Sequence, residues 1–130
     1  DLDGCLWSPE MYQLFYRGGA PFSPGTDGSM LTVSGESVNL LGDVRSIMSE
    51  LHRDPFWSDT TVGISSRTDE PNWARELLRK FEIDDITSNR DENDCGALFA
   101  LNDVFSFEEI SFDPKTKHFE RIAERTGIPM

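Results

Sequence analysis

Two aspartates at the start of the chain, Asp1 and Asp3, have the spacing of a pair of carboxylates that can act together. In an extended segment, residues two positions apart point to one side, where their carboxylates can share a cation. Gly4 allows the backbone to turn sharply just after them, as it does around a small anion. Taken alone, the pattern is more often a solvated acidic turn. An EF-hand calcium loop is excluded, because Cys5 and Tyr12 would occupy its fifth and twelfth positions.

Two further groups could act on a phosphate. Ser66 and Arg67 follow a β-branched, apolar run at 60–65, which predicts a buried strand. A hydroxyl and backbone N–H groups at such a strand end can hold a phosphate oxygen, although an ordinary turn with an exposed arginine explains them equally well. Lys115 stands one turn before a predicted helix, so its ammonium could return to the edge that carries the carboxylates. A surface lysine beside Lys117 is the simpler alternative.

The elements that must position these groups alternate between strand and helix. After an irregular loop at 8–29, alternating residues predict a small β-hairpin insert at about 28–41. The expected helices begin at Asp43, after Asp69 and near Lys115, and the last two expected strands span 60–65 and 109–112. The first helix has an apolar stripe of Val44, Ile47, Met48 and Leu51. This order indicates an α/β fold with a largely parallel sheet flanked by helices, with ligands at the carboxyl ends of its strands.

Composition narrows the classes of partner. The 130 residues include 24 acidic and 12 basic side chains, and the net charge of −12 repels nucleic acid and anionic lipid surfaces. A phosphate would therefore need local attraction from a divalent cation and positioned basic side chains. No apolar run is long enough to span a membrane. The two cysteines lack metal-site spacing, which favours a reducing compartment, the cytoplasm or an organelle stroma. The polar block at 88–94 predicts a surface insertion.

Taken in order, an acidic pair, a strand-end serine and a lysine before a helix resemble the first three motifs of the haloacid dehalogenase superfamily. Within it, the chain is most similar to the magnesium-dependent phosphatase-1 family. The similar stretches are Asp1-Leu2-Asp3-Gly4-Cys5-Leu6-Trp7, Ser66-Arg67-Thr68, His118-Phe119-Glu120-Arg121 and Thr126-Gly127-Ile128-Pro129. The resemblance covers nearly the whole chain, apart from insertions around 11–26 and 86–103. It implies a Rossmann-like fold of the haloacid dehalogenase type with no large cap.

The resemblance also implies a role for each candidate residue. Asp1 would be the nucleophile that forms an aspartyl-phosphate, and Asp3 would be the general acid/base. Ser66 would bind the transferring phosphoryl group with Arg67 beside it, while Lys115 would neutralise developing charge and orient Asp1. Mg²⁺ would lie between the Asp1 carboxylate, the Asp3 backbone carbonyl and the phosphate. The implied activity is a Mg²⁺-dependent phosphomonoester hydrolase acting on a phosphoprotein or on a phosphorylated small molecule such as a sugar phosphate.

The chain departs from the family pattern in several places. Cys5 stands where the superfamily usually has Thr or Val, and Gly4 stands where the nearer family usually has Tyr. The chain starts at the nucleophile without a preceding apolar strand and stops at Met130 before an acidic fourth motif. We therefore expect residues 1–130 to be one phosphatase domain truncated at both ends.

Two other functions stay open. One is a catalytically inactive interaction domain of the same fold. The other is a receiver-type phosphoacceptor domain. In such a domain the phosphorylated aspartate ends a middle strand, whereas Asp1 precedes all the expected strands of this chain.

Overall fold

The chain folds into a mixture of helices and short strands, so the expected α/β class is confirmed. The computed structural model describes residues 1–84 and 98–129. These form the helices α1 (Val44–Arg53), α2 (Pro71–Lys80) and α3 (Lys115–Thr126), and the 3₁₀ turns η1 (Met11–Leu14), η2 (Pro55–Trp57) and η3 (Leu101–Val104). The strands are β1 (Trp7–Ser8), β2 (Ser23–Pro24), β3 (Met30–Leu31), β4 (Ser37–Leu40), β5 (Gly63–Arg67), β6 (Glu82–Asp84), β7 (Leu98–Ala100) and β8 (Phe107–Ser111).

The parallel pair of β5 and β8 is the platform on which the candidate residues meet. Ser66 lies opposite Ile110 and Arg67 opposite Ser111, so both strands end at the same edge. The strand begins three residues later than the expected 60–65, which makes Ser66 and Arg67 its last two residues instead of loop residues. The apolar run misplaced the strand because backbone pairing with β8, and not side-chain hydropathy, sets its bounds.

A second sheet contains the predicted hairpin but is larger than expected. The turn between β3 and β4 is confirmed, and β1 and β2 add to it in the antiparallel order β1-β4-β3-β2. Among the described strand pairs β5–β8 is parallel, whereas those of this sheet and β6–β7 are antiparallel. The structure therefore does not show the largely parallel sheet that we expected.

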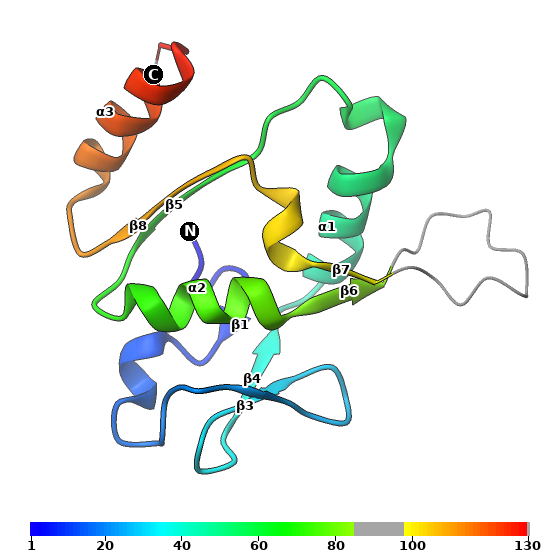
Figure 1. Ribbon diagram of the computed structural model, residues 1–130, viewed down its shortest axis with the longest axis vertical. Helices are drawn as coiled ribbons and strands as arrows, with labels where there is room; N and C mark the ends of the chain where they lie inside the picture. Colours follow the sequence, from blue (N-terminus) through cyan, green and yellow to red (C-terminus); the bar gives the residue numbers. More distant parts are fainter. Residues whose placement is uncertain (85–97, 130) are drawn as a thin grey trace, which may run out of the picture.

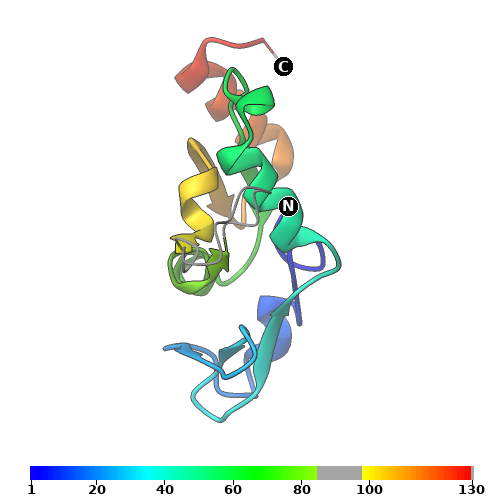
Figure 2. The same ribbon diagram turned by 90° about the vertical axis from the view of Figure 1, so that its right-hand side faces the viewer.

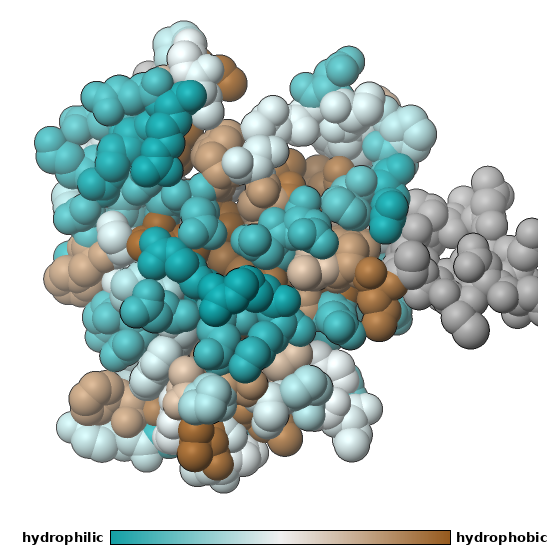
Figure 3. Space-filling model, viewed as in Figure 1, coloured by the Kyte–Doolittle hydropathy of each residue, from teal (hydrophilic) through white to brown (hydrophobic). Residues whose placement is uncertain are grey.

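The helices bury one face each, as the sequence pattern predicted. In α2, Ala74, Leu77 and Leu78 are fully buried, while hydrophilic side chains cover the outer sides of α2 and α3 (Figure 3). Helix α1 begins at Val44, directly after the expected start at Asp43, and ends at Arg53. Ile47 differs from expectation, because nearly half of its surface remains exposed at the edge of the apolar stripe.

The segment at 98–104 corrects another prediction. We expected an insertion over 86–103, but residues 98–104 belong to the packed body of the fold. Leu101 is fully buried, and its backbone N–H donates a hydrogen bond of 2.8 Å to the carbonyl of Phe81. The sequence did not predict β7 and η3, because this short apolar segment follows the charge-rich block at 88–94 and was grouped with it. The polar block at 88–94 lies outside the described residues.

The elements form an elongated body with the antiparallel sheet at one end and α3 at the other (Figures 1 and 2). Helix α3 packs on β8 and β5. Its first residue is Lys115, which therefore lies near the end of β8. Gly127 ends this helix with a left-handed backbone. In the part of the chain that the structure describes, none of the helices has the length and apolar content needed to cross a bilayer.

The close approach of β5 and β8 gives a stability prediction. A Cβ added at Gly63 would lie 1.9 Å from a ring carbon of Phe107. Gly63→Ala should therefore lower the free energy of unfolding by about 1–3 kcal/mol, the usual cost of overpacking. Denaturant unfolding monitored by circular dichroism would measure it. In a Phe107→Ala background the same change should cost much less, and an equal cost in both backgrounds would contradict this packing.

Candidate active site

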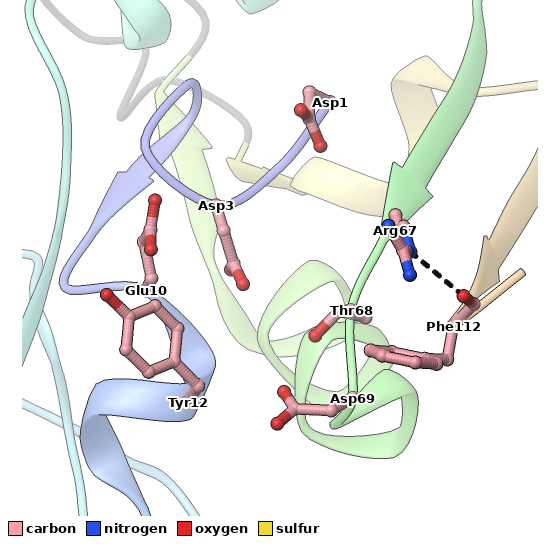
Figure 4. Close-up of a pocket in the computed structure, with 8 residues that line it drawn as sticks. All are labelled: Asp1, Asp3, Glu10, Tyr12, Arg67, Thr68, Asp69 and Phe112. Carbon is pink, nitrogen blue, oxygen red and sulfur yellow. Dashed lines mark hydrogen bonds between the residues drawn. The ribbon is translucent and has the colours of Figure 1, made fainter. Parts of the chain in front are cut away.

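A cleft of about 380 Å³ opens at the carboxyl end of β5. Figure 4 shows the N-terminal segment with Asp1 and Asp3 on one side and the chain leaving β5 on the other. The side chains that line it are Asp1, Asp3, Glu10, Tyr12, Arg67, Thr68, Asp69 and Phe112. The predicted residues Asp1, Asp3 and Arg67 are therefore gathered at one cleft, and Ser66 and Lys115 reach it through Asp1.

The Asp1 carboxylate is held from two directions. The Ser66 hydroxyl donates a hydrogen bond of 3.1 Å to Oδ1, and Lys115 Nζ lies 3.0 Å from Oδ2. Ser66 is fully buried at the end of β5, whereas Lys115 comes from the start of α3. About 44% of the Asp1 side chain remains exposed. The carboxylate is therefore oriented and still accessible to a ligand in the cleft.

The Asp3 carboxylate has a different environment. Trp7 Nε1 donates to its Oδ1 at 2.8 Å, and the backbone N–H of Met11 donates to its Oδ2 at 3.1 Å. Burial raises the pKa of Asp3, and the negative charges of Glu10 and Asp69 add to this, while the two hydrogen bonds oppose it. The net effect favours a protonated Asp3 over a wider pH range than an exposed aspartate.

Gly4 makes possible the turn that lies between Asp3 and Trp7. Its φ of +67° is a left-handed conformation that favours glycine, and a Cβ there would approach Glu10 Oε1 at 3.2 Å. The turn is closed by a hydrogen bond of 3.0 Å from the Gly4 N–H to the Trp7 carbonyl. It brings the Trp7 indole back over Asp3.

The basic side chains divide into two groups. Lys115 faces Asp1, whereas Lys117 points away and pairs with Glu120 at 3.1 Å. Arg67 lines the cleft, where its Nε donates 3.0 Å to the Phe112 carbonyl and its guanidinium lies 4.6 Å from the centre of the Phe112 ring. Arg67 is thus held at the cleft wall by Phe112, next to Ser66 in the chain, and neither of these contacts involves Asp1.

Sequence analysis missed five residues of the cleft. Thr68 and Asp69 directly follow the Ser66-Arg67 pair, so extending that motif along the chain would have found them. Glu10 and Tyr12 belong to the irregular segment 8–29, where no periodicity marks a residue that faces a site. Phe112 ends the segment expected as the last strand, and its ring is exposed.

Comparison with known proteins agrees with this arrangement. The family described as "Acid Phosphatase" matches residues 1–130. The chain belongs to this family. It is also 28% identical over 133 residues to human magnesium-dependent phosphatase 1, an alignment that covers 99% of the chain and 59% of that relative. The resemblance proposed from the motifs is therefore confirmed. The chain spans about three fifths of the length of this curated relative.

The environment of Asp3 predicts how its pKa will respond to mutation. The Trp7 indole stabilises the ionised carboxylate, so Trp7→Phe should raise the already elevated pKa of Asp3 further. A carbon-13 NMR titration of the side-chain carboxyl groups would measure the change. Asp113, whose pKa is lowered chiefly by its hydrogen bond with Arg121, is the internal control and should not move. An unchanged Asp3 titration would show that this hydrogen bond does not tune the acid.

Proposed function

We propose that this chain is the catalytic part of a Mg²⁺-dependent phosphomonoester hydrolase that acts through an aspartyl-phosphate on Asp1. The observation that carries the proposal is the Asp1 carboxylate, held by Ser66 and Lys115 at the wall of an open cleft. Membership of the acid phosphatase family and the similarity to human magnesium-dependent phosphatase 1 support the same reaction class.

In the proposed reaction, an Asp1 oxygen attacks the phosphorus of the substrate. The bond from phosphorus to the ester oxygen breaks, and the departing oxygen takes a proton from Asp3. Water then attacks the phosphorus of the aspartyl-phosphate and gives a proton to Asp3, which releases phosphate and restores Asp1. The raised pKa of Asp3 supports the first step, because the acid must be protonated when the leaving group departs.

Lys115 and Ser66 can reduce the charge repulsion that opposes this reaction. A carboxylate and an anionic phosphate ester repel each other unless positive charge lies near both. Lys115 supplies an ammonium 3.0 Å from the attacking carboxylate, and the Ser66 hydroxyl can pass its hydrogen bond to a phosphoryl oxygen. We assign Arg67 to the substrate beside the phosphoryl group, since its guanidinium borders the same cleft.

The donor types at the cleft fit Mg²⁺. Magnesium prefers carboxylate and carbonyl oxygens. We assign the metal to the Asp1 carboxylate, which stays 44% exposed at the cleft, and to the Asp3 backbone carbonyl, because the Asp3 carboxylate accepts hydrogen bonds from Trp7 and Met11. Among residues 1–84 and 98–129 there is no group of three or more His, Cys, Asp or Glu suited to a metal. When bound, the ion would neutralise charge on the phosphate.

The cleft also bears on the substrate and the fold. Figure 4 shows the N-terminal loop on one side of the cleft and the chain leaving β5 on the other, and the exposed part of the Asp1 side chain between them is compatible with a bulky substrate. We therefore keep a phosphoprotein or a phosphorylated small molecule such as a sugar phosphate as the substrate. We further propose that residues 1–130 form one domain with the Rossmann-like fold of the haloacid dehalogenase type.

The two carboxylates can be tested separately in the full-length protein. Asp1→Asn should abolish turnover, because an amide cannot attack phosphorus, and Asp3→Asn should slow it by about 10² to 10⁴-fold, the usual contribution of a general acid/base. Hydrolysis of an aryl phosphate with Mg²⁺, and after chelation by EDTA, gives the readout. An Asp1→Asn protein with full activity would exclude this mechanism. An inactive unaltered protein would favour the interaction-domain or receiver alternatives.

The two lysines of α3 provide a matched pair. Lys115→Ala removes the ammonium beside Asp1 and should lower kcat/KM by about 10² to 10³-fold, as loss of an electrostatic stabiliser does. Lys117 forms an exposed pair with Glu120, so Lys117→Ala should leave the kinetics nearly unchanged. Equal effects of the two substitutions on aryl phosphate hydrolysis would show that Lys115 does not serve the site.

A further inference from the structure

His118 is a polar side chain at the centre of the platform that the proposed reaction does not use. It is fully buried, and both ring nitrogens have partners. Nδ1 lies 3.2 Å from the Ser65 hydroxyl, and Nε2 lies 2.9 Å from the Ser111 hydroxyl. A hydroxyl can donate to one nitrogen or accept from the other, so a neutral imidazole satisfies both contacts in either tautomer.

The two serines lie next to the groups that hold Asp1. Ser65 directly precedes Ser66, the hydroxyl donor to Asp1. Ser111 is the last residue of β8, and its hydroxyl also accepts a hydrogen bond of 3.3 Å from the Asp113 N–H in the turn that leads into α3. His118 therefore contacts both strands of the parallel pair, at Ser65 within β5 and at Ser111 at the end of β8.

The same ring lies one helical turn after Lys115. Residues three apart on a helix share a face, so His118 and Lys115 both project toward the strand ends. One contacts the serines and the other contacts Asp1. A small shift of α3 along β8 would break the His118 hydrogen bonds and move the Lys115 ammonium from Asp1 together.

The charge state of His118 suits a fixed link. Burial is the main cause that lowers the pKa of His118. The nearby charges of Arg121 and Lys115 lower it as well, while Glu109 and Asp113 act in the opposite direction. The neutral ring is thus favoured, and it can bridge two hydroxyls without placing a further charge beside Lys115.

Resting on the proposed function, we propose that His118 is a positioning residue, whose bridge between Ser65 and Ser111 sets Lys115 and Ser66 around Asp1. The rest of α3 has its own anchors, since Arg121 lies 3.1 Å from Glu109 and 2.7 Å from Asp113. The helix therefore stays attached when the His118 bridge is lost, and what changes is the register at its first turn.

The test compares three variants of the full-length protein. His118→Phe keeps a ring of similar size without the hydrogen bonds and should lower kcat by about 10 to 100-fold with little change in KM, as small misplacements of catalytic groups do. His118→Gln keeps one donor and one acceptor and should retain more activity than His118→Phe. Ile122→Ala removes part of a buried side chain one turn later that has no hydrogen-bonding group, so it is the packing control and should change stability without this loss of kcat.

A double-mutant cycle decides whether the effect passes through Lys115. In a Lys115→Ala background, His118→Phe should cause a clearly smaller fold-loss than in the unaltered protein, because one of the two groups that it positions is already gone. Equal fold-losses in both backgrounds, or Ile122→Ala losing as much kcat as His118→Phe, would overturn the positioning role while the proposed phosphatase stands. No aryl phosphate hydrolysis by the unaltered protein would overturn both.

Discussion

The contact of one carboxylate with two elements far apart in the sequence is the constraint on which the rest of the structure depends. Asp1 meets Ser66 from β5 and Lys115 from α3, and the parallel pairing of β5 with β8 brings these two elements to one edge. The side chains of the Asp1–Lys115 pair are each more than 40% exposed, and such pairs contribute only about 0–1 kcal/mol to stability. The pair is thus better explained by the chemistry of the cleft than by folding.

The fold stabilises this edge with buried groups elsewhere. Apolar side chains from α2, β6 and η3 pack together in one core, and they include the fully buried Leu77, Ile83 and Leu101. Hydrogen bonds add direction to this non-directional packing: Trp7 fixes Asp3, and His118 joins the strand ends. An edge that orients Asp1 and keeps it accessible meets two requirements of the proposed phosphoryl transfer, a positioned nucleophile and space for a substrate.

The residues of the site that belong to short sequence motifs could be predicted from the sequence. Ser66 and Lys115 could be placed near each other because they stand at a predicted strand end and a predicted helix start, and the resemblance of the ordered motifs added Asp1. The contact of Trp7 with Asp3 could not, since it depends on the left-handed turn at Gly4. The burial of His118 was also hidden, because apolar periodicity does not count a histidine as a core residue. The late start of β5 and the packed residues 98–104 reflect pairing and packing between distant segments, which a local pattern does not contain.

The central claim is that Asp1 becomes phosphorylated during turnover. Acid quenching of the full-length protein while it hydrolyses an aryl phosphate, followed by borohydride reduction, would convert a phosphorylated aspartate into homoserine. Mass spectrometry of the digested protein would then locate it. We predict homoserine at Asp1 and an unmodified Asp3. Homoserine at another aspartate, or steady turnover with no trapped residue, would contradict the account.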